Sequence, residues 1–406
     1  MKECVKSFIE ELNAGFPHKT IDSNLARVYE YQQARLDEEG LEMRTKINPG
    51  SYNSEEQKVA SWKDTHYQTS VFYKHTNYIR SFYKKGEKNP IYTRKGHYLM
   101  YSDVTECLDY SVAGTDSYIC PNCGSASTLQ RLSSEGCAFC GTRFSLSELY
   151  PKVSCNYLVY GVFPGTPKEM AKDVLKVVIP VALLTMILII IYDITNGVSG
   201  FNFVLGLILG TLGGAFYGYI LWFIIMMVKM LMEAGRAMPK IFAAKDSTKE
   251  FTQRMRHFSE DFSYEYFTGK VVSMLKAIIY SSRDDNLPFY TGTETTEFDH
   301  VVESTFSGAL GLESFKVEGN IITVQTVAFV ENFYNVHGTI IKRDEKVRMT
   351  LKRDISKKIN YHFNIRAVNC PSCASSFDAL KNKHCPYCGS ALNMLEHDWV
   401  VSSCRK

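Results

Sequence analysis

Cysteine spacing is the feature of this 406-residue sequence that carries the most chemistry. Eight of the 12 cysteines form four C-x-x-C pairs, in two groups with 13 and 11 residues between the pairs: Cys120, Cys123, Cys137, Cys140 and Cys370, Cys373, Cys385, Cys388. Two such turns joined by a short hairpin supply the four thiolates of a zinc ribbon. Because four sulfur ligands leave no open coordination position, the sequence predicts two structural Zn²⁺ sites and no catalytic metal.

The alternatives for these pairs are disulfides and redox dithiols. Disulfides need an oxidising compartment, and the N-terminal residues MKECVKSFIEELNAGF lack the apolar segment of a signal peptide. A redox C-x-x-C would stand alone ahead of a helix, without a matching pair downstream. Glycine after the closing cysteine supports the zinc interpretation, because knuckle turns often need a left-handed backbone there; the glycines are Gly124, Gly141 and Gly389.

The other thiols and one histidine have plainer interpretations. His384 precedes Cys385 and could replace a sulfur ligand, but four cysteines already complete that site. We interpret the remaining cysteines as buried or free thiols: Cys4, Cys107, Cys155 and Cys404.

Two apolar segments follow the first ribbon. Residues 174–192 are apolar except for Lys176 and Thr185, and residues 201–228 carry no charge. About 20 apolar residues span the hydrocarbon core as a helix, so the sequence predicts a two-helix transmembrane hairpin within 174–232. Its short connection contains no Lys or Arg, whereas basic residues flank both outer ends, which predicts a two-pass cell-membrane protein with both termini cytoplasmic.

Glycine recurs every fourth residue in the second apolar segment, at Gly206, Gly210, Gly214 and Gly218. Such a stripe lets another helix backbone approach closely in lipid. The partner is either the first helix of the same hairpin or the same helix of a second subunit, which would make a homo-oligomer.

Overall charge does not indicate a polyanion-binding protein. The formal net charge is +3, and 45% hydrophobic residues exclude a disordered chain. Seven bases lie between Lys74 and Lys95 among tyrosines and phenylalanines. This stretch is interpreted as a solvated face, a patch for anionic lipid or a nucleic-acid surface. A second basic stretch comprises Lys342, Arg343, Lys346, Arg348, Lys352 and Arg353.

The soluble parts read as α+β. Residues 1–40 are expected to be helical, residues up to Tyr118 strand-rich, and residues 245–282 helical. A short helix is expected near 298–306, followed by strands at 312–318, 321–333 and 339–354, with a hairpin turn at Gly319-Asn320.

One stretch resembles a known family. The order of the helix DFSYEYFTGKVVSMLKAIIYSSRDDNL, the meander NIITVQTVAFVENFYNVHGTIIKRDEKVRMTLKRD and a closing strand beginning HDWVVSS is similar to the Tim-forty-four-like family, over about 150 residues from Asp246 onwards. That family includes mitochondrial tethers, mitochondrial-ribosome membrane anchors and bacterial membrane proteins. The resemblance implies a nuclear-transport-factor-like cone, with Trp399 in its last strand. The inserted second ribbon suggests the bacterial branch.

The predicted organisation is an α+β multidomain chain. Its parts are an N-terminal helical and strand-rich region at 1–110, the first ribbon at 111–165, the hairpin at 174–232, and the cone at 246–406 with the second ribbon inserted at 366–392. No HExxH, GxSxG, Walker or GxGxxG motif occurs in a convincing context. Glu331 and His337, which would line the cone, are the only candidates for catalysis in it.

The sequence therefore predicts a non-enzymatic, membrane-anchored cytoplasmic scaffold or tether. It would bind an unidentified protein partner or the membrane surface, and two zinc ribbons would stabilise it. The alternative is a membrane-anchored nucleic-acid or ribosome-binding protein that uses the ribbons and the basic stretches. A third possibility is an enzyme with its site in the cone.

Overall fold

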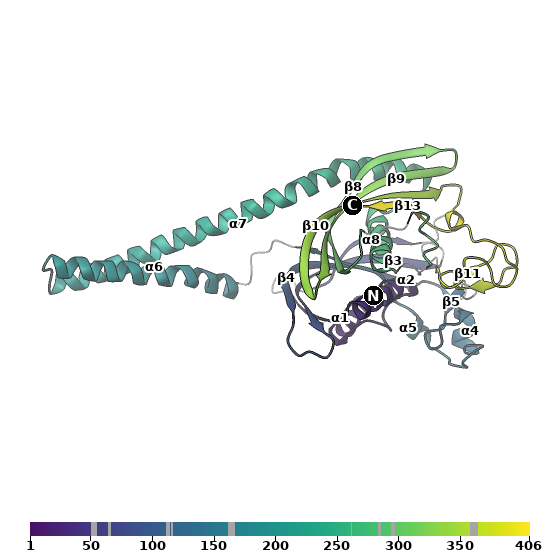
Figure 1. The fold of residues 1–406 in the computed structure, drawn as a ribbon, viewed down its shortest axis with the longest axis horizontal. Coiled ribbons are helices and arrows are strands. Elements are labelled where there is room, and N and C mark those ends of the chain that lie inside the picture. Colours follow the sequence, from purple (N-terminus) through teal and green to yellow (C-terminus); the bar gives the residue numbers. More distant parts are fainter. Residues whose placement is uncertain are drawn as a thin grey trace. The chain divides into compact units, whose positions relative to one another are not determined.

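The computed structural model describes residues 1–49, 55–63, 66–110, 114, 117–160, 167–260, 262–282, 286–293, 297–357 and 364–406. Its contacts divide the chain into two compact units, Met1–Gly161 together with Lys240–Lys406, and Val162–Pro239. The first unit is mixed α+β with antiparallel sheets, and the second is a pair of helices (Figure 1).

The N-terminal half of the first unit begins with two helices, α1 (Lys2–Ala14) and α2 (Ser23–Glu38). Its antiparallel sheet has the order β1-β3-β4-β7, with β2 paired to the remaining length of β3. The strands are β1 (Leu41–Pro49), β2 (Gln57–Lys63), β3 (Tyr67–Lys84), β4 (Tyr92–Cys107) and β7 (Lys152–Tyr160). One stripe of α1 packs on this sheet through Val5, Phe8 and Leu12, as its helical periodicity predicts.

The C-terminal half has a matching order. The end of α7 (Phe201–Phe258) and α8 (Tyr264–Tyr280) precede an antiparallel sheet with the order β8-β9-β10-β13. The strands are β8 (Val301–Glu318), β9 (Ile321–Val336), β10 (Thr339–Asp354) and β13 (Val400–Arg405). The hairpin at Gly319-Asn320 is confirmed, with Gly319 at φ 59°.

Two expectations for this half are wrong in detail. The helix expected over 245–282 is broken, because α7 ends at Phe258 and the Ser263 hydroxyl caps a new helix by accepting from the Tyr266 backbone N–H at 3.3 Å. The short helix expected near 298–306 is instead the start of β8, which pairs with β9 from Val301 onwards. Pairing along a long neighbouring strand outweighs the weak local preference of this segment.

A zinc-type ribbon interrupts each sheet at the same place, directly before its last strand: between β4 and β7 in the N-terminal sheet and between β10 and β13 in the C-terminal sheet. The first ribbon contains β5 (Ser117–Ile119), β6 (Ala126–Thr128), α4 (Leu129–Ser134) and α5 (Leu146–Leu149). The second contains β11 (Val368–Asn369), β12 (Ser376–Phe377) and the 3₁₀ turn η1 (Met394–Glu396). The two halves therefore repeat one topology of two helices, a meander, a ribbon and a closing strand, with β1 and β2 together taking the place of β8 in the N-terminal half.

The two halves share one hydrophobic core. Val28 of α2 and Cys155 and Tyr157 of β7 belong to the same buried cluster as α8 and the C-terminal sheet. Gly269 of α8 permits this contact, because a Cβ there would lie 2.6 Å from Asp103 Oδ2 and 3.2 Å from Cys155 Sγ. The regions expected at 1–110 and 246–406 therefore pack as a single compact body.

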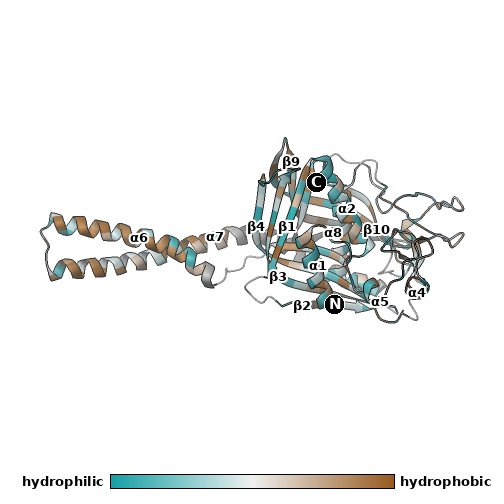
Figure 2. Ribbon diagram, turned by 90° about the horizontal axis from the view of Figure 1, so that it is seen from below, coloured by the Kyte–Doolittle hydropathy of each residue, from teal (hydrophilic) through white to brown (hydrophobic). Residues whose placement is uncertain are grey.

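The second unit is a helical hairpin formed by α6 (Pro167–Thr195) and the N-terminal part of α7. The spans Met170–Thr195 and Phe201–Met232 are long and apolar enough to cross a membrane, and Figure 2 shows both helices largely in the colour of hydrophobic residues. Their apolar side chains are mostly exposed. The glycine stripe faces α6: a Cβ at Gly210 would lie 1.6 Å from Ile189, and one at Gly214 would lie 1.9 Å from Thr185. The hairpin itself therefore occupies the stripe.

Candidate metal centres and the cavity between them

Each predicted set of four cysteines converges on one point. The four Sγ atoms of each set lie within 4.8 Å of one another. The closest separations are 3.7 Å for Cys120–Cys140, 3.6 Å for Cys123–Cys137, 3.5 Å for Cys370–Cys388 and 3.6 Å for Cys373–Cys385. Sulfurs 2.3 Å from a tetrahedral Zn²⁺ are about 3.8 Å apart, whereas a disulfide needs about 2.05 Å. The donor sets therefore fit a closed zinc site and not disulfides.

The four knuckles share one backbone pattern. In each, the leading cysteine accepts a backbone hydrogen bond from the residue after the closing cysteine, at 2.8 to 2.9 Å; the donors are Gly124, Gly141, Ala374 and Gly389. All four donors have a positive φ, between 59° and 76°. Three are glycine as predicted, and Ala374 adopts the left-handed conformation without that freedom.

Burial divides the ligands into inner and outer thiols. The leading cysteine of each knuckle is buried and the closing one is exposed. Burial raises the pKa of Cys120 to about 12, whereas a hydrogen bond from the Ser125 hydroxyl lowers the pKa of Cys137 to about 6. A hydrogen bond from Ser390 similarly lowers the pKa of Cys388 to about 6. Zn²⁺ binds thiolates, so these serine hydroxyls favour the ligating form of one sulfur in each site, the buried Cys137 and the exposed Cys388.

The ribbons lie on either side of a cavity of about 1650 Å³. Its walls come from the segment between α1 and α2, from Cys120–Asn122 of the first ribbon, and from Ala367–Asn369 beside the second ribbon. The two short strands β5 and β11, which precede the leading cysteines, both line it, and Ser117 Oγ lies 2.8 Å from Asn369 Oδ1. The cavity is thus built from both halves of the repeat.

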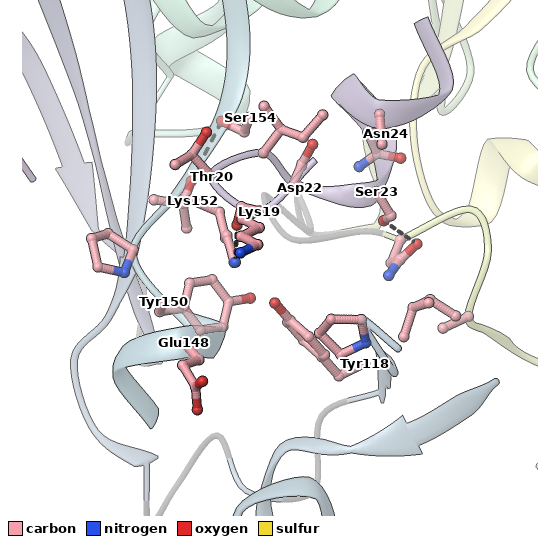
Figure 3. Close-up of a pocket in the computed structure, with 18 of the residues that line it drawn as sticks. Lys19, Thr20, Asp22, Ser23, Asn24, Tyr118, Glu148, Tyr150, Lys152 and Ser154 are labelled. Atoms are coloured by element: carbon pink, nitrogen blue, oxygen red, sulfur yellow. Dashed lines mark hydrogen bonds between the residues drawn. The ribbon is translucent and has the colours of Figure 1, made fainter. Parts of the chain in front are cut away.

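Aromatic and charged groups meet in this cavity. Figure 3 shows Tyr118 and Tyr150 on the first-ribbon side, opposite Lys19 and Lys152. The Tyr118 hydroxyl donates to the Leu149 carbonyl at 2.8 Å. Bases and acids both line the walls, the bases being Lys19, Lys152 and Arg366 and the acids Glu3, Asp22 and Glu148. A site of this size with mixed charge suits a polar ligand with several functional groups. The residue spacing gave no indication of it.

The first basic stretch does not form one exposed patch. Arg80 and Arg94 are buried, and they pair with Glu303 of β8 and Glu331 of β9. Arg94 Nη1 also donates to Thr305 Oγ1 at 2.9 Å. The two arginines therefore join the two sheets. Around Arg80 of β3, buried positions (Thr76, Tyr78 and Arg80) alternate with partly exposed ones; strand periodicity places Arg80 on the same face as Tyr78 but does not identify its acidic partner.

Two of the six bases of the second basic stretch are paired with acids among the described residues. Lys342 pairs with Glu331 at 2.6 Å and Arg348 with Glu313 at 3.0 Å. The Arg353 guanidinium is buried 5.9 Å from the Trp399 ring, and Arg343 lies over Tyr334.

The remaining candidates are dispersed. Glu331 is engaged by Arg94 and Lys342, and His337 lies at the exposed β9–β10 turn. His384 is exposed, and the cysteine cluster beside it closes without it. Cys4, Cys155 and Cys404 are buried and Cys107 is partly buried; burial raises the pKa of Cys4 to about 11 and of Cys404 to about 12, as for unreactive core thiols.

Comparisons of the chain with protein-family models, with curated proteins and with solved structures find no match. The resemblance to the Tim-forty-four-like family therefore stays a prediction, and function is argued from the residues and their geometry.

Proposed function

We propose that the chain is a membrane-anchored scaffold that binds a protein partner through a body stabilised by two zinc ribbons. One observation carries this proposal: the ribbons that contain the two Cys₄ sets both line a single large cavity, the first through Cys120–Asn122 and the second through Val368 and Asn369, in a chain whose separate hairpin is long and apolar enough to span a membrane. Closed sites stabilise folds and leave no coordination position for substrate. The ribbons would then shape a binding surface, and the hairpin would hold it at the membrane.

The repeated topology supports a further part of the proposal. Both halves have the helix, meander and closing-strand order that the Tim-forty-four-like resemblance assigned to the C-terminal half alone. We propose that the chain is a tandem of two nuclear-transport-factor-like cones, each interrupted by a ribbon, in a bacterial two-pass protein. The basic flanks of the hairpin favour a cytoplasmic body, where thiols stay reduced and available for zinc.

Burial of Arg80 and Arg94 favours a protein partner over nucleic acid. A nucleic-acid surface needs accessible Lys and Arg side chains to bind the phosphates. Arg80 and Arg94 are instead paired with carboxylates inside the body. Neutralisation of Lys342 and Arg348 weakens the second stretch in the same way.

The proposal is tested with the full-length chain in its native membranes. Crosslinking there is followed by recovery of the proteins and RNA bound to the chain at low and at high salt. We expect recovery of a defined protein set that is insensitive to salt, that is lost in a Cys370→Ser, Cys373→Ser variant and that is kept in Cys107→Ser, which changes a cysteine outside the ribbons. RNA recovered with a steep salt dependence, and no salt-resistant protein, would support the nucleic-acid alternative instead.

A further inference from the structure

A small polar chamber lies directly behind the cavity between the ribbons. Its volume is about 50 Å³, and it shares the lining residues Asp22, Asn24 and Ser154 with the larger cavity. The chamber is enclosed by α2, β4, β7 and α8, so both halves of the repeat build it. A ligand in the larger cavity could therefore extend one end group into the chamber.

Two lining side chains of the chamber are buried without hydrogen-bond partners. Arg27 is 4% exposed and Asp103 is 2% exposed. Among the described residues, neither Arg27 Nε and Nη1 nor Asp103 Oδ1 has a partner. An unpaired buried guanidinium is expensive, so such groups in proteins are normally satisfied by another residue, by water or by a ligand.

The charges around the chamber favour an anionic occupant. The groups that face it are Arg27, Lys270, Asp22, Asp103 and Asp398. Lys270 is paired with Asp398, and Arg27, whose charge is attracted by the nearby Asp22 and Asp398, forms no ion pair of its own among the described residues. Burial holds the pKa of the Asp103 carboxyl well above its usual range, which favours the protonated form that offers an O–H donor. The Arg27 guanidinium presents N–H groups that lack partners in the part of the chain that the structure describes, and a carboxylate supplies the complementary acceptors; Asp103 lines the same chamber and adds an O–H donor in its protonated form.

We propose that the chamber binds a carboxylate and that the cavity in front of it receives the polypeptide that carries this carboxylate at its C-terminus. The chamber has room for a planar end group. The larger cavity outside it has a volume of about 1650 Å³ and is lined by charges of both signs. A polypeptide offers both acidic and basic side chains to such walls, as well as a backbone to the short strands β5 and β11. The identity of the ligand as a polypeptide rests on the proposed protein-binding function.

The experiment uses the full-length chain in nanodiscs and two pools of fluorescein-labelled random octapeptides. One pool ends in a free carboxylate and the other is amidated. We expect retention of the free-acid pool and at least about tenfold weaker retention of the amidated pool, because a charged hydrogen-bond partner is lost. A separate arm measures the melting temperature in sodium acetate against sodium chloride of equal ionic strength.

Arg27→Met removes the charge and keeps most of the volume over the Phe289 ring, from which the guanidinium carbon lies 4.7 Å. We expect this variant to lose preference for the free-acid pool while its melting temperature stays level or rises, because an unpaired buried charge is removed. Asp103→Leu is a second variant with the same expected loss of preference, and Asp103→Asn should retain it through its amide donor. Arg254→Met, at an exposed position of α7, is the control.

The outcomes separate the possibilities. Equal retention of the two pools, with no acetate effect, overturns the proposal and leaves the chamber to water. In another outcome, acetate raises the melting temperature of the wild-type chain but not of Arg27→Met, while neither peptide pool is retained. This result would support a carboxylate site in the chamber and overturn the proposal that its ligand is a polypeptide. Recovery of the same protein set by Arg27→Met in native membranes would overturn the chamber as partner site while leaving the scaffold function intact.

Discussion

At the scale of single residues, small hydroxyl donors and left-handed turns prepare the two metal centres. Ser125 Oγ lies 3.2 Å from Cys137 Sγ, and Ser390 Oγ lies 3.2 Å from Cys388 Sγ, so each site has one sulfur whose thiolate is stabilised before metal arrives. Ala374 is the one donor of the four knuckle turns that is not glycine. The two sites are therefore chemically alike, and the turn that contains Ala374 in the second site has a modest backbone strain.

Zinc content tests the metal assignment. Wild-type chain purified under reducing conditions should contain about two Zn²⁺, and Cys137→Ser should contain about one, because three ligands hold zinc far more weakly than four. Elemental analysis measures this, with Cys107→Ser expected to keep both ions. Wild-type protein without zinc, or Cys137→Ser with both ions, would contradict the assignment.

Asp22 should give the body a pH-dependent stability. Its side chain accepts the cap hydrogen bond from Leu25 N at 2.7 Å, and burial raises its pKa to about 6 despite the opposing effects of that bond, Lys270 and Arg27. The folded state then holds the proton at pH values where the unfolded chain, with an ordinary pKa near 3.8, has lost it. The contribution of this group to stability should fall as the pH rises from about 4 to about 6.

Asp22→Asn should remove this dependence and keep the cap, because asparagine also accepts the N-cap hydrogen bond. Urea unfolding at pH 4 and pH 6 measures the difference between the wild-type chain and the variant. An identical pH dependence in both chains would show that Asp22 keeps its ordinary titration.

At the scale of elements, the hairpin shows how glycine lets helices approach. A Cβ at Gly218 would lie 2.8 Å from Val178 Cα, and one at Gly214 would lie 3.1 Å from Ala182 Cα, so side chains at these positions would meet backbone. In lipid such close contact is a main source of helix association. The stripe is therefore a contact within the chain, as one of the two sequence interpretations proposed.

Gly214→Leu should separate α6 from α7 and destabilise the hairpin. Gly213→Leu is its matched control, because nothing lies within 4 Å of a Cβ there. Thermal unfolding in detergent, together with cysteine crosslinking between the two helices, measures the effect. An equal response of the two variants would argue against packing of the stripe on α6.

At the scale of the whole molecule, buried ion pairs join the two repeated halves. Glu303 is 2% exposed and is reached by Arg80, by the Tyr78 hydroxyl at 3.4 Å and by Thr305 Oγ1 at 3.4 Å. Phe82 and Phe333 stack beside this network with ring centroids 6.4 Å apart. The contact between the sheets is thus both apolar and charged, so it requires a matched pair of residues from the two halves.

Arg80→Met should destabilise the body by about 3–5 kcal/mol, because it leaves the Glu303 carboxylate buried without its cation. Adding Glu303→Leu should restore most of the loss, since no unpaired charge then remains. Urea unfolding of the single and double variants measures both changes. Arg254→Met, in the exposed Arg254–Glu250 pair, should cost less than about 0.5 kcal/mol. A double variant as unstable as Arg80→Met would overturn this account.

Local features were predictable because short-range chemistry governs them. The C-x-x-C spacing predicted both cysteine clusters, since each pair lies in one turn, and continuous apolar stretches predicted the two long helices. The strands of the C-terminal meander and its Gly319-Asn320 turn were predictable for the same reason. The start of β8 was not predictable, because its pairing with β9 determines that this segment is a strand.

The sequence by itself determined that this chain has two Cys₄ sites, two apolar helices and an α+β body. Only the tertiary structure decided that both halves repeat one topology, that Arg80 and Arg94 are buried, and that the ribbons border a common cavity. The physical reason is sequence distance: Arg80 meets Glu303 across 223 positions and Ser117 meets Asn369 across 252. The pattern of apolar side chains determines which face of a helix or strand is buried, but the packing of the whole chain determines which residues that face contacts.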